Sequence, residues 1–178
     1  MGLLSPNLNV AELVDLHYQA LFRYAYRLAG SASDAEDLTQ ETFCKAQAHW
    51  RQLRDPSQAR AWLFSILRNA YLQRCRHKKQ ACEVPLEDLL EEAQEPLLSP
   101  WPVEPERLQD ALHRLPEEFR TPIILYYFEE FSYKEIADQM AVPIGTVMSR
   151  LSRAKAWLRQ HLQDGMTEMR CVKNEVNE

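Results

Sequence analysis

The chain has 178 residues, of which 46% are hydrophobic, and its formal net charge is −5. This length allows one or two domains at roughly 100–200 residues each, and the apolar content is sufficient for packed cores. No apolar run approaches the ~18 residues of a membrane-spanning helix, and the N-terminus lacks the basic region and apolar core of a signal peptide, so we expect an intracellular, cytoplasmic protein without membrane insertion. Four glycines are few for a β-rich protein, and long amphipathic segments favour an all-α fold.

The negative charge is concentrated in the middle of the chain. Residues 1–80 carry 11 Lys/Arg and 7 Asp/Glu, whereas residues 81–110 carry 1 Lys/Arg and 9 Asp/Glu. Residues 111–162 are nearly neutral, with 7 Lys/Arg and 6 Asp/Glu. A partner meets the local charge, so the acidic total does not exclude a nucleic-acid partner.

The first part of the chain, residues 1–79, is expected to form a helical domain. Apolar residues recur at helical spacing over 10–30, and the buried candidates are Leu13, Leu16, Leu21, Tyr24 and Leu28. Ser33 with Glu36 forms a capping box, which predicts a second helix running to about Trp50. Its inward positions are Leu38, Thr42 and Ala46. Its exposed face is acidic and amide-rich, with Asp34, Glu36, Asp37, Gln40 and Glu41.

A loop over 52–59, marked by Asp55-Pro56-Ser57, separates this helix from a third one over 59–79. The third helix is first aromatic and apolar, with Trp62, Phe64, Ile66, Leu67 and Tyr71. It then becomes basic, with Arg74, Arg76, Lys78 and Lys79.

Residues 80–105 are expected to form an acidic linker, because five prolines prevent a continuous helix there. A second domain over 106–162 begins with a helix marked by Leu108, Leu112 and Leu115. Pro116 suits the first turn of the next helix, whose buried end is predicted at 123–128. Residues 163–178 are expected to be a frayed polar tail.

The segment 132–158 predicts a helix-turn-helix. Ser132 and Glu135 form a capping box, and Ala141-Val142-Pro143 ends the first helix. The second helix has an apolar stripe of Val147, Leu151, Ala154 and Leu158. Its opposite face carries Thr146, Ser149, Arg150 and Arg153, and no acidic residue occurs over 144–163. A helix in a DNA major groove has this character, since carboxylates are repelled by phosphates.

No motif for catalysis, nucleotide binding or a cofactor is present, and we expect neither enzymatic activity nor a small-molecule substrate. The four cysteines form no CxxC pair. Cys75, His77 and Cys82 lie close enough in sequence for metal binding or redox sensing, but their spacing matches no common zinc template, and ordinary free thiols are the alternative.

Three stretches in order resemble bacterial RNA polymerase sigma factors of the extracytoplasmic-function (ECF) type. These are residues 34–43 (DAEDLTQETF), residues 61–69 (AWLFSILRN), and residues 115–120 (LPEEFR) with 131–137 (FSYKEIA) and 145–154 (GTVMSRLSRA). The resemblance covers about residues 10–162. It implies domain 2 and domain 4 of such a factor, joined by the linker, and partners that are core RNA polymerase, promoter DNA and an anti-sigma factor.

The resemblance also implies residue roles. The acidic helix would dock on a basic coiled coil of the polymerase through Asp34, Asp37, Leu38, Gln40, Glu41 and Phe43. The separated −10 strand would be held by Arg54, Ser57, Trp62, Asn69, Tyr71, Arg74 and Arg76, although Trp62 could equally be a core residue. Gln73 stands where an aspartate is common in the family, which leaves the −10 preference open.

In domain 4, the resemblance implies −35 contacts by Ser132, Tyr133, Lys134, Thr146, Ser149, Arg150, Arg153 and Lys155. Lys155 could instead be a solvated charge, and Met148 replaces a lysine frequent in the family. The main alternative is a helix-turn-helix regulator that acts without core polymerase, usually as a symmetric dimer. That alternative gives residues 10–79 no function.

Overall fold

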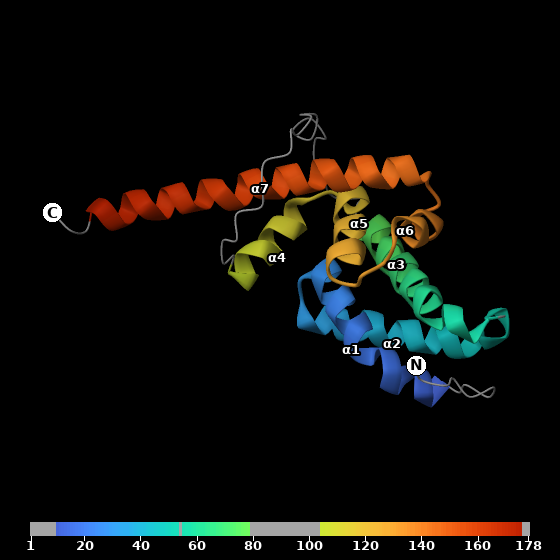
Figure 1. The fold of residues 1–178 in the computed structure, drawn as a ribbon. Coiled ribbons are helices and arrows are strands. Elements are labelled where there is room, and N and C mark those ends of the chain that lie inside the picture. Colours follow the sequence, from blue (N-terminus) through green and yellow to red (C-terminus); the bar gives the residue numbers. More distant parts are fainter. Residues whose placement is uncertain (1–9, 54, 79–103, 176–178) are drawn as a thin grey trace. The chain divides into compact units, whose positions relative to one another are not determined.

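The computed structural model describes residues 10–53, 55–78 and 104–175, which form helices joined by short turns and loops, with no strand among them. The helices are α1 (Val10–Ala29), α2 (Ala32–Ala48), α3 (Ala59–Lys78), α4 (Pro105–Arg114), α5 (Glu117–Tyr127), α6 (Tyr133–Met140) and α7 (Ile144–Glu175) (Figure 1). The all-α prediction is confirmed. Two compact units divide the chain, one with α1–α3 and one with α4, α5, α7 and most of α6. The predicted linker lies almost wholly outside the described residues.

The core of the first unit is formed by apolar stripes of α1, α2 and α3, which pack on one another. Tyr24 of α1 and Phe64 of α3 are fully buried and their rings lie 5.0 Å apart. Leu13, Leu21 and Leu28 are buried as predicted. The prediction for Leu16 is wrong, because its side chain is 60% exposed. It lies one turn from Leu13 but on the solvent-facing edge of the stripe.

The N-terminus of α2 differs from the prediction. Ser31, not Ser33, caps this helix, and its hydroxyl oxygen accepts a hydrogen bond from the Asp34 amide at 3.3 Å. Ser31 is followed three residues later by Asp34, and Ser33 by Glu36, so two overlapping segments have the spacing of a capping box. The helix also ends earlier than predicted, at Ala48, and short 3-10 turns follow at Trp50–Gln52 and Pro56–Gln58.

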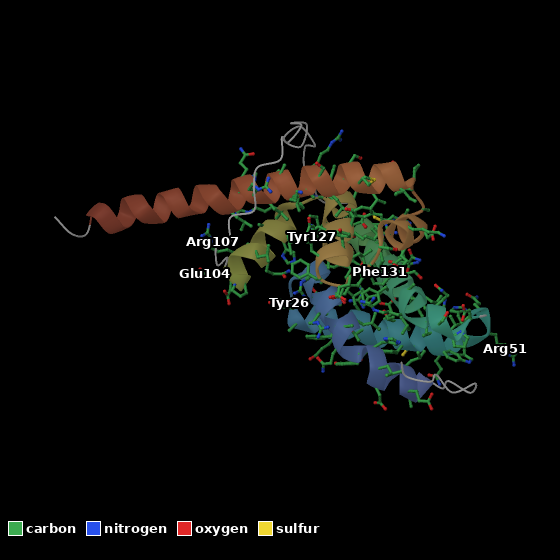
Figure 2. The ribbon with its side chains drawn as sticks, viewed as in Figure 1. Tyr26, Arg51, Glu104, Arg107, Tyr127 and Phe131 are labelled. Carbon is green, nitrogen blue, oxygen red and sulfur yellow. The ribbon has the colours of Figure 1, made fainter. Side chains whose placement is uncertain are left out.

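The second unit is built around α5, whose buried residues face α7. Pro122 lies inside α5 and is buried without ending the helix. The buried end predicted at 123–128 is only partly present: Ile123, Ile124 and Leu125 are buried, whereas Tyr127 is 54% exposed (Figure 2). The predicted stripe of α7 is confirmed, because Val147, Leu151, Ala154 and Leu158 are all buried.

Arg120 of α5 holds the C-terminal end of α4. Its guanidinium donates to the carbonyl oxygen of His113 at 2.8 Å and to that of Leu115 at 2.7 Å. The last carbonyls of a helix have no intrahelical donor. The Arg120 side chain supplies hydrogen bonds to two such carbonyl oxygens at the end of α4. Burial, followed by the nearby Arg120 charge, lowers the pKa of His113.

The helix-turn-helix has the predicted capping box. The Ser132 amide donates to Glu135 Oε2 at 2.8 Å, and the Glu135 amide donates to the Ser132 hydroxyl at 3.3 Å. Helix α6 ends at Met140, and Ala141 then adopts a left-handed conformation with φ of 54°. The Val142 amide donates to the Ala137 carbonyl at 3.1 Å, which is the hydrogen bond of a Schellman-type helix end.

The tail prediction is wrong for residues 163–175, which continue α7. No proline interrupts this segment, and it is rich in residues with high helix propensity. Gly165 alone does not end a helix.

Ala141→Gly is expected to stabilise the helix-turn-helix by about 0.5–1 kcal/mol. An L-residue in the left-handed region bears a steric penalty that glycine lacks, and part of the gain is lost to the more flexible unfolded chain. Chemical denaturation followed by circular dichroism measures the change. Ala156→Gly, in the interior of α7, is the matched control and should destabilise by about 1 kcal/mol. Destabilisation by Ala141→Gly would contradict the turn conformation.

The second unit is expected to lose stability as the pH falls from about 6.5, the ordinary value for histidine, through the lower folded-state pKa of His113. Between these two pKa values the unfolded chain protonates His113, whereas the folded protein keeps the ring neutral. The Gln109 amide nitrogen lies 3.1 Å from His113 Nε2 and can donate only to the neutral ring. His113→Gln should therefore flatten the decline in melting temperature between pH 7 and pH 5.5. A decline in the variant as steep as in the wild type would contradict this role of His113.

Candidate functional site

Helix α2 presents the predicted acidic face on the surface of the first unit. Asp37 and Gln40 are exposed, and Asp34 is half-exposed. Leu38 and Phe43 are buried, and the Phe43 ring stacks on Tyr18 of α1 at 6.5 Å between centroids. Leu38 and Phe43 therefore anchor α2 to the core and do not belong to its exposed surface.

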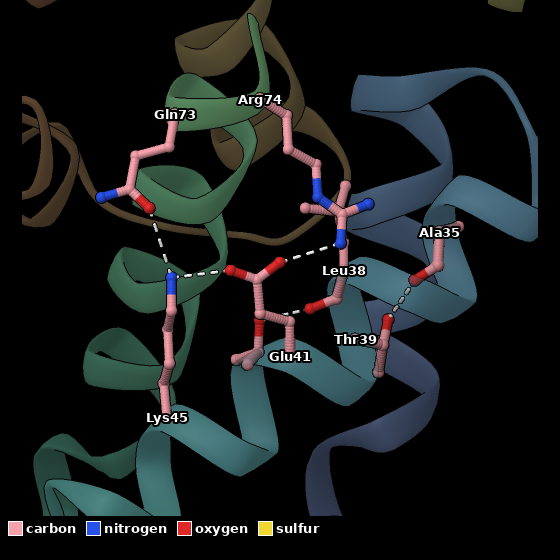
Figure 3. Close-up of polar contacts among 8 residues, drawn as sticks. Ala35, Leu38, Thr39, Glu41, Lys45, Gln73 and Arg74 are labelled. Carbon is pink, nitrogen blue, oxygen red and sulfur yellow. Dashed lines mark hydrogen bonds and ion pairs between the residues drawn. The ribbon is translucent and has the colours of Figure 1, made fainter. Parts of the chain in front are cut away.

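Glu41 lies at the edge of α2 that faces α3 and is the centre of an ion-pair network (Figure 3). Its Oε1 lies 2.7 Å from Lys45 Nζ, and its Oε2 lies 2.8 Å from Arg74 Nη2. A hydrogen bond from Lys45, and a second one from Arg74, keep the pKa of Glu41 below its ordinary value. Lys45 Nζ also donates to Gln73 Oε1 at 3.4 Å. The structure thus joins a predicted polymerase contact, Glu41, to a predicted −10 contact, Arg74.

The predicted −10 residues of α3 fall on two sides of the helix. Trp62, Asn69 and Arg76 share one face, within about 40° of arc at roughly 100° per residue. Asn69 and Arg76 are exposed, and Trp62 is half-buried with its ring edge-on to Trp50 at 6.3 Å. Tyr71 lies about 180° from Trp62 around the axis. The structure therefore does not bring Trp62 and Tyr71 together on one stacking surface.

The loop before α3 is ordered around Asp55. Ser57 donates to this carboxylate from its amide at 2.9 Å and from its hydroxyl at 2.8 Å, and these bonds lower the pKa of Asp55. Ser57 remains exposed. Arg54 lies outside the described residues. Arg51, which the sequence analysis did not select, is exposed at this loop end of the unit (Figure 2).

In the second unit, the start of α6 carries three predicted contacts. Ser132 and Lys134 are exposed, whereas Tyr133 is half-buried. The Tyr133 ring stacks on Tyr126 of α5 at 4.8 Å, and a hydrogen bond with Tyr126 raises the pKa of Tyr133. This stacking holds the start of α6 against α5.

Helix α7 brings four of its five predicted residues to one face. Thr146, Ser149, Arg150 and Arg153 fall within about 100° of arc, and Ser149 and Arg153 are exposed. Arg150 Nη2 lies 2.9 Å from Glu118 Oε2 on α5, and only 21% of the Arg150 side chain is exposed. Lys155 lies about 180° from Thr146, on a different side of the helix.

Lys45, Trp50 and Glu118 contact predicted site residues, and the sequence analysis selected none of them. The spacing of four between Glu41 and Lys45 is a usable helical signal. Nothing in the sequence pairs Trp50 with Trp62 or Glu118 with Arg150, because these contacts depend on how helices pack.

Among the described residues, no group of three or more His, Cys, Asp or Glu side chains could hold a metal ion. Cys75 is a free, half-exposed thiol, and Cys82 lies outside the described residues, as does the His77 side chain. Over the described ranges, no helix is long and apolar enough to cross a membrane.

Two family models match the chain: Sigma-70 region 2 over residues 13–81 and Sigma-70 region 4 over residues 106–158. The ECF RNA polymerase sigma factor SigL of Mycobacterium tuberculosis is 36% identical, over 85% of this chain and 88% of SigL. SigE of Mycolicibacterium smegmatis is also 36% identical, over 88% of this chain but only 63% of SigE.

A solved structure of the sigma factor RpoE from Bartonella quintana, in complex with the anti-sigma factor NepR, is similar to this fold. The identity is 31%, the TM-score is 0.70, and the match covers 86% of this chain and 96% of RpoE. The order of the two matched regions, the all-α fold and the identity to full-length relatives agree. The chain belongs to the ECF family of RNA polymerase sigma factors.

Proposed function

We propose that the two units of this sigma factor divide promoter recognition, with polymerase docking and −10 contacts in the first unit and −35 contacts in the second. The protein is an alternative sigma factor that directs promoter-specific transcription with core RNA polymerase. The observation that carries this function is that regions 2 and 4 match one chain in family order. The chain would act as an initiation factor, not an enzyme, in the cytoplasm.

The exposed part of α2 supports a docking role. Asp37 and Gln40 present a carboxylate and an amide to solvent, and Leu38 and Phe43 anchor the helix that carries them. Charged and polar groups at a rim orient a basic partner and speed encounter more than they add affinity. Asp34 and Glu41 extend this surface along the helix.

The outer face of α3 supports a role in holding separated DNA. Arg76 offers a cation, Asn69 offers an amide, and Trp62 offers a partly exposed ring for base stacking. Ser57 and Arg51 place a hydroxyl and a second cation in the preceding loop. Tyr71 would act elsewhere, because it lies on the other side of α3.

The exposed face of α7 supports major-groove binding. Arg153 is the most accessible cation of this face, with Ser149 beside it. Arg150 lies on the same face, and its ion pair with Glu118 holds the guanidinium in place. We therefore assign Arg150 a phosphate or base contact made from this fixed position. Ser132 and Lys134 would fix register through the DNA backbone. An anti-sigma partner, as RpoE has in NepR, would compete for these surfaces.

Transcription in vitro with core polymerase on a promoter library tests the function. Initiation from a defined set of promoters is expected. If the protein neither initiated nor bound core polymerase, yet bound palindromic DNA as a dimer, a conventional helix-turn-helix regulator would be the correct assignment.

Asp37→Asn combined with Gln40→Ala is expected to weaken binding to core polymerase about three- to tenfold, because exposed polar pairs each contribute up to about 1 kcal/mol. Affinity for a −35 duplex should not change. Titration of labelled protein with core polymerase measures the first effect, and gel-shift of the duplex measures the second. Glu12→Gln on α1 is a charge-removal control outside the predicted contact. Equal effects of the double variant on both assays would contradict the division of roles.

Arg153→Gln is expected to weaken −35 binding about tenfold, as for the loss of one arginine contact in the major groove, with unchanged thermal stability. Arg150→Gln should weaken binding and also slightly lower the stability of the second unit, since it removes the ion pair with Glu118. Duplex titrations and thermal melts, run on both variants, separate the two roles. The assignment fails if Arg153→Gln binds as well as the wild type.

A further inference from the structure

The exposed face of α7 differs from the face that sequence periodicity selected. Over residues 146–153 of this helix, four residues are exposed: Met148, Ser149, Ser152 and Arg153. Thr146 and Arg150, which the periodicity placed on the same face, are only half-exposed. The four exposed residues span about 140° of arc at roughly 100° per residue, centred within about 20° of the direction opposite the buried stripe. Met148 therefore belongs to the outward side of α7.

Apolar side chains form one flank of this outward side. The exposed fraction is 52% for Met148 and 46% for Ile144, which lies one turn earlier at the first position of α7. Single exposed apolar residues are ordinary on protein surfaces, but residues four positions apart on a helix are neighbours and form a continuous patch. In helix-turn-helix proteins, the N-terminal residues of the second helix are the ones that contact base edges in the major groove.

The first turn of α7 also leaves room for a close neighbour. A Cβ added at Gly145 would meet no atom of the described residues within 4 Å, and the φ angle of Gly145 is not in the left-handed region. The fold of the free protein therefore does not require glycine at this position. Glycine also serves where a ligand approaches the backbone closely, and an approach of DNA to this turn would use the open space.

The chemistry of Met148 restricts what it can recognise in DNA. Its thioether has no charge and no hydrogen-bond donor, so it cannot pair with a phosphate or with the acceptor atoms of the bases. The C5-methyl group of thymine is the apolar group that base edges present in the major groove. A flexible, polarisable methionine adapts well to such a surface. A lysine at this position would instead add a phosphate contact that is independent of sequence.

We propose that Met148, with Ile144 beside it, contacts thymine methyl groups in the −35 element and makes this sigma factor selective for thymine there. The inference rests on the −35 role proposed above for the exposed face of α7. Ser149 and Arg153 supply the polar contacts of that face. No acidic residue occurs over 144–163, so the apolar patch can approach DNA without repulsion of the phosphates. Met148 is thereby assigned as a specificity-determining residue.

Replacement of thymidine by deoxyuridine tests the contact, because the two nucleosides pair identically and differ only in the C5-methyl group. The protein is the full-length chain at saturating core polymerase, and the probe is a fluorescein-labelled duplex of a promoter that it initiates. Each thymidine of the −35 segment is replaced in turn, on both strands. At one or two positions, wild-type binding is expected to weaken about three- to fivefold, the effect of removing one methyl group from an apolar contact.

Met148→Ala should reduce this deoxyuridine penalty to below about 1.5-fold, because the apolar partner of the methyl group is gone. Met148→Lys should reduce it equally and should steepen the salt dependence of log K by about 0.9, for one added phosphate contact. Leu16→Ala on α1 is the matched control. It removes another exposed apolar side chain, outside the second unit, and should retain the wild-type penalty.

The proposal is overturned if the −35 segment has no thymidine that responds to deoxyuridine, or if Met148→Ala retains the full penalty. Failure of the sigma function would appear separately, as absence of initiation by the wild type. In that case the same replacements are made in a duplex that the full-length protein selects from a random-sequence pool, so the contact of Met148 is decided independently.

Discussion

The packing of α3 against α2 is the constraint on which the chemistry of the first unit depends. Leu63, Leu67 and Ala70 of α3 are buried, and this stripe sets the rotation of the helix. Once that rotation is fixed, Asn69 and Arg76 must face solvent and Arg74 must approach α2. The ion pair with Glu41 is a consequence of core packing, since the apolar stripe would impose the same proximity without any charge.

The second unit shows the same dependence with a different outcome. The buried stripe of α7 turns Ser149 and Arg153 outward, and it also brings Arg150 to the edge that meets α5. Arg120 uses its guanidinium inside the unit to close the end of α4, whereas Arg153 keeps its guanidinium exposed. Arg120 therefore has a structural role, whereas Arg153 is a candidate functional residue. Charge counts alone make no such distinction.

Sequence periodicity predicted the helices and their buried stripes because one side of each helix must be apolar, as at Val147, Leu151 and Ala154. It did not predict helix ends where two capping patterns overlap, as at Ser31 and Ser33. It also failed at the continuation of α7, where helix propensity persists without an apolar signal. The candidate surfaces could be placed on helices from sequence, but the contacts of Glu41 and Arg150 could not, since each joins residues more than thirty positions apart.

The two ion pairs differ in what they allow. The Arg150 side chain is only 21% exposed, so loss of its partner Glu118 would leave a largely buried guanidinium without compensation, although Glu118 itself is 38% exposed. Arg74 and Glu41 are each about one-third exposed, and water can replace either partner at little cost. A pair of the first kind fixes a side chain for one task. A pair of the second kind joins two helices at the surface without fixing either side chain. The low exposure of the Arg150 side chain therefore favours a fixed position for its guanidinium at the edge of the exposed face of α7.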